Sequence, residues 1–310
     1  MNKRRIVVTG GAGFIGSNIT RTLSSDNEII VIDNLSTGHI ENIQDLMDQN
    51  SITFVNDTIT NLDLLKNLFK NVDFVFHQAA IPSVPRSIKD PISSNYANIN
   101  GTLNVLVAAK QNNVKKVVYA SSSSVYGDTP TLPKKEEMKP SPLSPYAVSK
   151  LTAEYYCQVF TGVYGLPTAS LRYFNVYGPK QDPSGDYAAV IPKFIQRVMD
   201  NQSPVIFGDG KQTRDFSFIN DVVKANILAA ESQATGVFNV AGGKRITINK
   251  LAELVMNLIG NNLDIKYEEP RPGDIMHSLA DISKAEDHLG YKPDFDIEKG
   301  LMETIKWFQK

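Results

Sequence analysis

A glycine-rich stretch near the N-terminus constrains the fold of this 310-residue chain more than any other feature. It reads TGGAGFIG over residues 9–16, follows the apolar run 6–8 and opens a segment with helical periodicity. Glycines spaced in this way allow a tight turn and a close approach of the backbone to a pyrophosphate, while the helix N-terminus supplies N–H groups and partial positive charge. The stretch therefore predicts the phosphate site of a dinucleotide. The residues expected to form it are Gly10, Gly13, Phe14, Ile15 and Gly16.

An acidic residue at the end of the second apolar run indicates which dinucleotide is bound. Asp33 directly follows the run at 29–32 and comes 20 residues after Gly13. A carboxylate at this place accepts hydrogen bonds from the adenine ribose and repels a 2′-phosphate. The sequence therefore predicts NAD rather than NADP as the cofactor.

Short apolar runs alternate with helical patterns through the first half of the chain. The runs are continuous rather than alternating, which is typical of parallel strands buried on both faces. Strands separated by helices pair in parallel through right-handed crossovers. The pattern predicts an α/β fold with a doubly wound parallel Rossmann sheet. Strands are expected at 6–8, 29–32, 52–55, 74–76, 117–119 and 168–171, and helices at 14–24, 61–70, 93–112 and 146–162.

The regular alternation of apolar runs and helical patterns ends after about residue 175, where clusters of glycine and proline recur. Loops carried on a rigid scaffold often hold substrate sites. One more buried strand is predicted at 236–240, returning to the sheet. We therefore expect a smaller, interleaved α/β substrate domain. The predicted boundaries are 1–175 for the Rossmann domain, with a returning segment near 216–245, and 176–215 with 246–310 for the substrate domain.

Two residues at the start of a predicted helix indicate redox chemistry at a hydroxyl group. Tyr146 and Lys150 are four residues apart and so share one helix face. A free tyrosine has a pKa of about 10, but a nearby ammonium and a positive nicotinamide ring both favour the phenolate. Such a phenolate can remove a proton from a hydroxyl. The serine run 121–124 directly follows the strand at 117–119, where open α/β sheets place their chemistry.

The composition of the chain indicates which partners it can bind and in which cellular compartment it is expected. The formal net charge is −1, so no global field favours nucleic acid. No apolar stretch approaches the roughly 20 residues of a membrane span, and the apolar run after the N-terminal charges is too short for a signal peptide. A single cysteine, Cys157, fits a reducing compartment, and its apolar neighbours indicate a buried helix thiol. We expect a cytoplasmic protein that is complete from residue 1. No metal is expected, because the histidines lack ligand spacing; they are His39, His77, His277 and His288.

Several further motifs carry a resemblance to a known family. They are Asp33-Asn34, Asp57-Thr58, HQAA at 77–80, NINGT at 98–102, YASSSSVYG at 119–127, Pro145-Tyr146, RYFNVYGP at 172–179, Arg214-Asp215 and RPGD at 271–274. Together with the glycine loop they make the chain resemble the extended short-chain dehydrogenase/reductase family over essentially its whole length. Within that family it is similar to the UDP-glucose 4-epimerases, including the branch that also accepts UDP-N-acetylglucosamine.

The resemblance implies roles for individual residues. Ser122 matches the catalytic serine, beside Tyr146 and Lys150. Tyr173 would pack against the nicotinamide, and Asp57 with Thr58 would face the adenine. The other matched cofactor positions are Asn34, Ala79, Ala80 and Asn98. The matched positions for the nucleoside diphosphate are Asn175, Val190, Val205, Phe207, Arg214, Arg271 and Asp274. Arginine suits phosphate because its fork of donors matches the oxygen geometry.

Within the family, the serine run favours epimerisation. Nucleotide-sugar dehydratases carry Thr-Asp-Glu where this chain has Ser122-Ser123-Ser124, and decarboxylating relatives typically carry Glu where Ser124 stands. Without a titratable side chain there, the expected reaction is oxidation and re-reduction at one carbon through a 4-keto sugar. Strict glucose/galactose enzymes have a bulky Tyr where this chain has Ser278. We therefore expect a UDP-hexose 4-epimerase, an isomerase acting on UDP-glucose/galactose, as in galactose metabolism, and on the N-acetyl sugars.

Other functions remain open at this stage. A uronate epimerase would need a cation for the sugar carboxylate, and Arg86 or Lys180 could serve. A dehydratase of unusual sequence and a non-catalytic NAD-binding regulator are further alternatives. Relatives pair two helices of each subunit in a homodimer, and the segments 93–112 and 146–162 are apolar enough for that arrangement.

Overall fold

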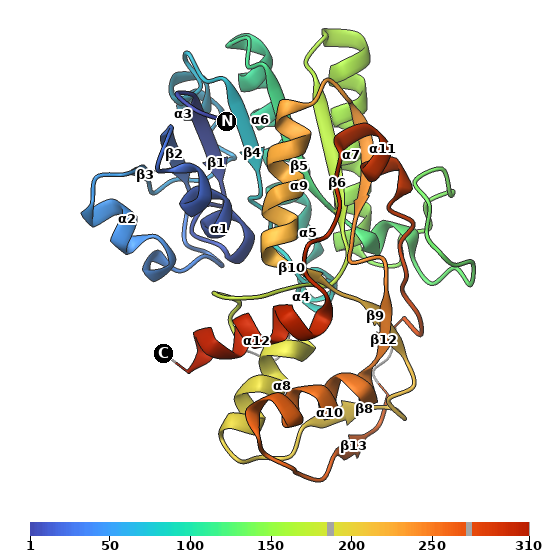
Figure 1. Ribbon diagram of the computed structural model, residues 1–310. Coiled ribbons are helices and arrows are strands. Elements are labelled where there is room, and N and C mark those ends of the chain that lie inside the picture. Colours follow the sequence, from blue (N-terminus) through green and yellow to red (C-terminus); the bar gives the residue numbers. More distant parts are fainter. Residues whose placement is uncertain (185–188, 271–274, 310) are drawn as a thin grey trace.

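The computed structural model describes residues 1–184, 189–270 and 275–309. A seven-stranded sheet lies at its centre, and every neighbouring pair of strands is parallel. This confirms the predicted Rossmann sheet, including the returning strand (Figure 1). In spatial order the strands are β11 (Gly236–Val240), β6 (Thr168–Tyr173), β5 (Lys116–Ser122), β4 (Phe74–His77), β1 (Arg5–Thr9), β2 (Glu28–Ile32) and β3 (Thr53–Val55).

Successive side chains of each strand point to opposite faces of the sheet, and this divides the core into two layers. On β1, Ile6 and Val8 belong to one buried cluster, and Val7 belongs to the other. The first layer is covered by α1 (Phe14–Leu23) and α9 (Ile219–Glu231), which pack on each other. The second is covered by α3 (Leu62–Leu68), α6 (Gly101–Gln111) and α7 (Pro145–Tyr164). Helices on both faces explain why the strands read as continuous apolar runs.

The helix predicted over 93–112 is divided in the structure. It consists of α5 (Pro91–Asn95), one wider π-helical turn, η2 (Tyr96–Asn100), and then α6. A π-helical turn inserts an extra residue and rotates the side chains that follow, and such turns are frequent at functional sites. The short elements around it are η1 (Ile40–Asn42), α2 (Gln44–Asp48), α4 (Val84–Lys89) and η3 (Ser123–Tyr126).

A smaller group of elements lies below the carboxyl ends of the sheet strands in Figure 1. There α10 (Ile248–Ile259) packs on α8 (Val190–Met199) and on α12 (Ile297–Phe308). The paired strands of this part are β8 (Val205–Phe207) with β13 (Lys266–Glu268), β9 (Thr213–Asp215) with β12 (Arg245–Thr247), and β7 (Val176–Tyr177) with β10 (Ser217–Phe218). One helix of the C-terminal segment, α11 (Ser283–Leu289), packs instead on β11 and α9. The division into two domains stays a prediction.

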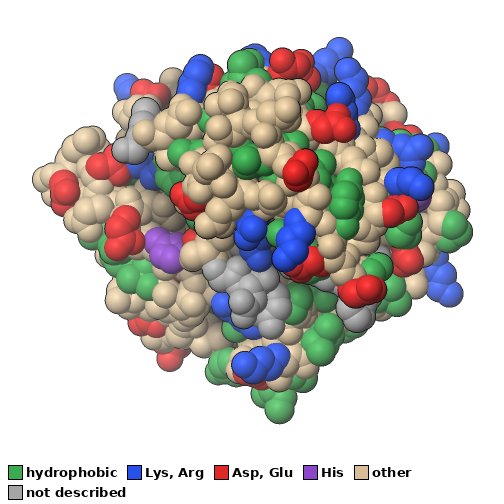
Figure 2. Space-filling model, turned by 90° about the horizontal axis from the view of Figure 1, so that it is seen from below, with side chains coloured by type: hydrophobic (Ala, Val, Ile, Leu, Met, Phe, Trp, Pro, Cys, Tyr) green, Lys and Arg blue, Asp and Glu red, His purple; other side chains and the backbone are tan. Residues whose placement is uncertain are grey.

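Acidic and basic side chains are interspersed over the face shown in Figure 2. None of the helices in the described ranges combines the length and apolar character of a bilayer-spanning segment. Among the same residues, no three His, Cys, Asp or Glu side chains gather as metal ligands would.

Cys157 is buried on α7, as predicted, and burial raises the pKa of its thiol to about 12.

Candidate functional site

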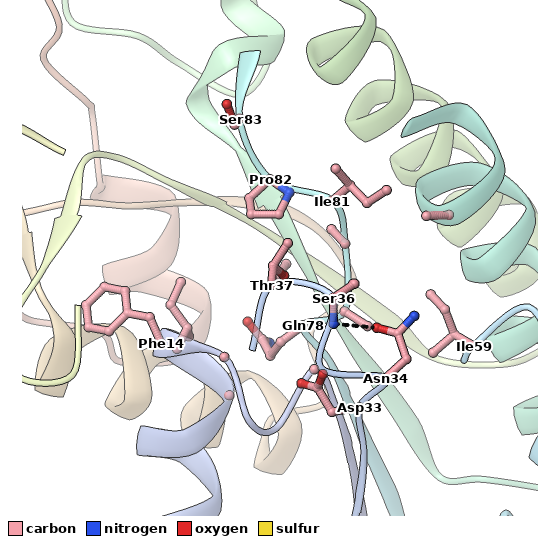
Figure 3. A pocket seen from close by; sticks show the side chains of 18 of the residues that line it. Phe14, Asp33, Asn34, Ser36, Thr37, Ile59, Gln78, Ile81, Pro82 and Ser83 are labelled. Atoms are coloured by element: carbon pink, nitrogen blue, oxygen red, sulfur yellow. Dashed lines mark hydrogen bonds between the residues drawn. The ribbon is translucent and has the colours of Figure 1, made fainter. Parts of the chain in front are cut away.

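A cavity of about 450 Å³ opens at the carboxyl ends of β1, β2, β4 and β5. The glycine loop and Asp33 line one part of it, and Tyr146 and Lys150 line another. Figure 3 shows Phe14, Asp33 and Gln78 around the cavity. The fold thus brings the two features predicted from the sequence, the dinucleotide site and the reactive pair, to a single cavity.

The glycine loop packs too tightly to accept side chains at two of its positions. A Cβ on Gly16 would lie 2.0 Å from the carbonyl oxygen of Gly10. Gly10 has a φ of +70°, and a Cβ there would lie 2.6 Å from the amide nitrogen of Ala79. At Gly13 the nearest protein atom would be 3.2 Å away, and no side chain caps the helix α1 that begins after it. This uncapped helix N-terminus at the cavity fits the phosphates of a dinucleotide.

The Asp33 side chain also links the glycine loop to the turn that follows β2. Its Oδ2 accepts a hydrogen bond from the Ala12 amide at 3.0 Å, and its Oδ1 accepts one from the Leu35 amide at 2.8 Å. Burial raises the pKa of this carboxyl, although the two hydrogen bonds act in the opposite direction. The next residue, Asn34, accepts from the Ser36 amide at 3.2 Å (Figure 3). Each Asp33 oxygen keeps a lone pair with which it can accept from a ribose hydroxyl.

The other predicted cofactor residues divide into two groups. Asp57, Thr58, Ala79 and Ala80 line the cavity. Asn98 is not among its lining residues: it is buried beneath the cavity, where its Oδ1 accepts from the Ile81 amide at 2.7 Å. Its Nδ2 donates to the carbonyl of Ile81 and to Ser149 Oγ. Asn98 therefore shapes the site by holding Ile81, which does line it.

Tyr146 lies in the first turn of α7, and its amide donates to Ser87 Oγ at 3.0 Å. The Nζ of Lys150 is 5.8 Å from the centre of the Tyr146 ring and donates to the carbonyl of Ala120 at 2.7 Å. The Tyr146 hydroxyl also interacts with Ser122, which follows the lining residue Ser121 but does not itself line the cavity. The predicted pair and serine are therefore adjacent.

The two members of the pair titrate differently from the sequence-based expectation. Burial raises the pKa of Tyr146, and the hydrogen bond with Ser122 only partly opposes this. Burial lowers the pKa of Lys150 to about 8. The expected depression of the tyrosine pKa is therefore not a property of the protein alone, because low polarity disfavours the phenolate. The Lys150 ammonium, 5.8 Å from the ring centre, and the nicotinamide charge are the contributions that favour the phenolate.

Tyr173 ends β6 and lines the same cavity, with 7% of its surface exposed. Its hydroxyl accepts from Asn226 Nδ2 at 2.9 Å and donates to Gln78 Oε1 at 3.3 Å. These two amides, on α9 and after β4, fix the ring in the wall of the cavity.

Two of the predicted diphosphate and sugar residues, Asn175 and Ser278, are joined outside the cavity, and a third, Arg214, bonds to the segment just before Ser278. Asn175 Nδ2 donates to Ser278 Oγ at 3.2 Å and to the carbonyl of Asp215 at 2.8 Å. The Asp215 amide donates to the same Ser278 oxygen at 3.2 Å. Arg214 Nη1 donates to the carbonyl of Met276 at 3.2 Å. Burial raises the pKa of the Asp215 carboxyl to about 7, although backbone amides, Ala280 first, oppose the shift.

The remaining predicted substrate residues lie on nearby elements or outside the described residues. Val190 opens α8, and the half-buried Val205 and Phe207 lie on β8. Arg271 and Asp274 lie outside the described residues.

Sequence reasoning did not single out several residues that line the cavity. Two of them, Ser36 and Thr37, lie two and three residues after Asn34, Ser121 belongs to the serine run and Gln78 to the HQAA motif, so proximity to a motif was the available signal. The others are Ile32, Ile59, Ile81, Pro82, Ser83, Ala97, Ala120, Gln181, Asp182 and Ala189.

Comparison with known proteins agrees with this geometry. Residues 6–241 match the model of the NAD dependent epimerase/dehydratase family. A putative UDP-glucose 4-epimerase of Methanocaldococcus jannaschii is 41% identical, with 98% of each chain covered. The structure of a UDP-N-acetylglucosamine 4-epimerase from Methanobrevibacter ruminantium, in complex with UDP-N-acetylmuramic acid, is 48% identical with a TM-score of 0.97 and coverage of 100% of this chain and 99% of the other.

A second structure, a UDP-glucuronic acid 4-epimerase from Bacillus cereus with UDP-glucuronic acid and NAD, is 33% identical with a TM-score of 0.91 and coverage of 98% of this chain and 99% of the other. The glycine loop, Asp33 and the cavity fit NAD, which is the cofactor of this protein. The chain belongs to the NAD-dependent epimerase/dehydratase family.

Proposed function

We propose that the protein is a UDP-hexose 4-epimerase that interconverts UDP-glucose with UDP-galactose and UDP-N-acetylglucosamine with UDP-N-acetylgalactosamine. The observation that carries this proposal is Tyr146 beside Lys150 in the wall of the dinucleotide cavity, with Ser122 next to Tyr146 and no acid in the serine run. The carboxylate that contacts this run, Glu154, is fully buried and paired with Arg172. Because this carboxylate is buried and paired, it is not available for the second acid–base step that a dehydratase needs.

In the proposed mechanism the Tyr146 phenolate removes the proton of the sugar 4-hydroxyl. Ser122 donates its hydrogen bond to the reacting oxygen, and the Lys150 ammonium stabilises the phenolate. NAD, when bound, would accept the hydride from carbon 4 and return it. The 4-keto sugar turns about its link to the diphosphate, so that the opposite face of carbon 4 is reduced, and Tyr146 returns the proton to the 4-oxygen. We assign Asn175, Arg214, Arg271 and Asp274 to holding the nucleoside diphosphate during this turn.

Two observations support the wider choice of sugar. Ser278 has a small side chain where strict glucose enzymes have a tyrosine, and it lies beside Asn175. The relative from Methanobrevibacter ruminantium, at 48% identity, is described as a UDP-N-acetylglucosamine 4-epimerase. Both the NAD and the nucleotide sugars of the proposed reaction are cytoplasmic metabolites, so we propose a cytoplasmic enzyme.

Incubation of the purified protein with each UDP-sugar tests the proposal directly. We expect epimers as products by chromatography, with only transient NADH absorbance because the cofactor is regenerated. A dehydrated product, or conversion of UDP-glucuronate alone, would reject the proposed function. Turnover of UDP-glucose without any N-acetyl activity would reject the argument from Ser278.

UDP-glucuronate remains the second candidate, since a UDP-glucuronate 4-epimerase of Thermodesulfobacterium geofontis is 36% identical. The two cations considered for its carboxylate do not favour it. Lys180 Nζ donates to the Asn42 carbonyl, and burial lowers its pKa to about 8. Arg86 is exposed on α4 and does not line the cavity. Among the described lining residues, Lys150 is the only Lys or Arg.

We also propose a homodimer formed through α5 and α7. Apolar side chains are exposed along these neighbouring helices and the adjoining turn: Ile92 (80%), Tyr96 (56%), Val148 (46%), Tyr155 (50%), Val159 (46%) and Val163 (71%). Ile92→Glu is expected to convert a dimer to a monomer, because it places a charge in an apolar interface. Light scattering measures the mass, with Met302→Glu on α12 as the control. A wild-type monomer, or a dimer that tolerates Ile92→Glu, would contradict this assignment.

A further inference from the structure

Glu154 continues the face of α7 that carries the reactive pair. Tyr146, Lys150 and Glu154 follow one another at intervals of four residues, so they lie along one side of the helix. Lys150 is 3% exposed and Glu154 is fully buried. A buried carboxylate one turn beyond a buried ammonium is costly unless the two are compensated, so its surroundings show what it does.

The Glu154 carboxylate joins α7 to two neighbouring strands. Arg172 on β6 donates from Nε to Oε1 at 2.9 Å and from Nη2 to Oε2 at 2.8 Å. Ser121 Oγ, at the end of β5, donates to Oε1. Lys150 donates to the carbonyl of Ala120, the residue before Ser121. The end of β5 is therefore held to α7 from two successive turns of the helix.

The charge of Glu154 acts on Lys150 in the direction that catalysis requires. Burial lowers the pKa of Lys150 to about 8, and the nearby Glu154 carboxylate opposes this shift. An opposite charge one helical turn away favours the ammonium, and the ammonium in turn favours the Tyr146 phenolate.

The other groups that face Lys150 do not supply this charge. The Tyr119 ring on β5 lies 5.1 Å from Nζ, and burial keeps the pKa of its hydroxyl well above the usual range. His77 on β4 has a pKa lowered to about 3 by burial, so it stays neutral. Burial raises the pKa of Cys157 on α7 to about 12, which keeps the thiol protonated.

We propose that Glu154 is a positioning residue of the reactive pair: its buried carboxylate keeps Lys150 charged and holds the end of β5, which carries Ser121 and Ser122, against α7. The inference deepens the proposed function, because it rests on Tyr146 and Lys150 being the reacting groups. Glu154 itself touches neither cavity nor substrate, so it acts only through its neighbours.

The test is a pH titration of Lys150 by NMR, with ¹³Cε-labelled lysine in the full chain. Lys150→Arg identifies the resonance. We expect a midpoint near pH 8 in the NAD-free wild-type protein and a midpoint about one pH unit lower in Glu154→Gln. Lys116 is the matched control: it is also buried with a pKa of about 8, but it donates to carbonyls of Ser232 and Ala234 at the opposite end of β5. Its midpoint, assigned with Lys116→Arg, should stay in place.

Turnover provides a second readout. The alkaline limb of the pH profile of kcat should move down with the Lys150 midpoint in Glu154→Gln. The alkaline limb should lie at the same pH in Lys150→Arg and in Glu154→Gln/Lys150→Arg, because the arginine introduced at position 150 keeps its charge. An inactive wild type would reject the proposed function while leaving the NMR result intact.

Glu154→Gln leaves the Arg172 charge buried and unpaired, which is destabilising. Glu154→Gln/Arg172→Gln removes both charges and is expected to show a downward shift of the Lys150 midpoint no larger than that of Glu154→Gln, because the Arg172 cation is lost as well. An unchanged Lys150 midpoint in a folded variant would overturn the proposal. Failure of both variants to fold would overturn it as well, since the ion pair would then be a requirement for folding.

Discussion

Tyr146→Phe should lower turnover of the UDP-sugar by about 10²–10⁴-fold, the usual contribution of a positioned acid–base group, while NAD stays bound. The substitution removes the hydroxyl that is hydrogen-bonded to Ser122 and keeps the ring beside Lys150. The glycine loop and Asp33, which form the other part of the cavity, are unaffected. Steady-state kinetics gives the loss, and the NAD content of the purified variant gives the binding.

Tyr164→Phe is the matched control for this prediction. Tyr164 lies on the same helix but is 50% exposed and outside the proposed interface, so loss of its hydroxyl should leave the chemistry unchanged. Full activity of Tyr146→Phe would refute the assigned base. Loss of bound NAD together with activity would instead show that the tyrosine acts mainly in cofactor binding.

Ser278→Tyr should remove most activity toward the N-acetyl sugars, with a smaller loss toward UDP-glucose. The new ring would occupy the space that we assign to the acetamido group. The structure adds a second effect, because Ser278 Oγ accepts hydrogen bonds from Asn175 and from the Asp215 amide. A tyrosine cannot keep its oxygen at that position, so Asn175 would lose a partner. Since a hydrogen bond contributes about 1 kcal/mol, that second effect should cost both sugars about tenfold or less.

Ser278→Ala separates the two effects. It removes the hydroxyl but not the space, so kcat/KM should fall by a similar factor for UDP-glucose and UDP-N-acetylglucosamine. In Ser278→Tyr the ratio of the two kcat/KM values should change by about 100-fold in favour of UDP-glucose, the scale of rejecting a group that a pocket cannot admit. An unchanged ratio in both variants would show that Ser278 does not select the sugar.

Local spacing explains which parts of the site could be predicted from the sequence. The glycine loop and Asp33 belong to a strand–helix–strand unit, whose geometry follows from the residues themselves. Tyr146 and Lys150 share one helix face for the same reason. Ser122 was assigned through a family motif, and the structure places it where its side chain affects the pKa of Tyr146.

Contacts between distant segments explain what could not be predicted. Asn98 was matched to the cofactor path, but the π-helical turn places its side chain beneath Ile81. The pairing of Asn175 with Ser278 joins residues 103 apart in the chain. The titration of Tyr146 and Lys150 depends on burial, which results from the packing of α7 against β5.

The sequence by itself determined the α/β class, the parallel strands, the NAD cofactor and the adjacency of Tyr146 and Lys150 on one helix face, because each depends on residues within one or two neighbouring elements. Only the tertiary structure decided that Asn98 supports the cavity from below, that Ser278 is bound to Asn175, and that Glu154 lies behind Lys150 with its charge balanced by Arg172. Hydrogen bonds and charge interactions of this kind depend on distance in space and on exclusion of water, and neither can be read from spacing along the chain.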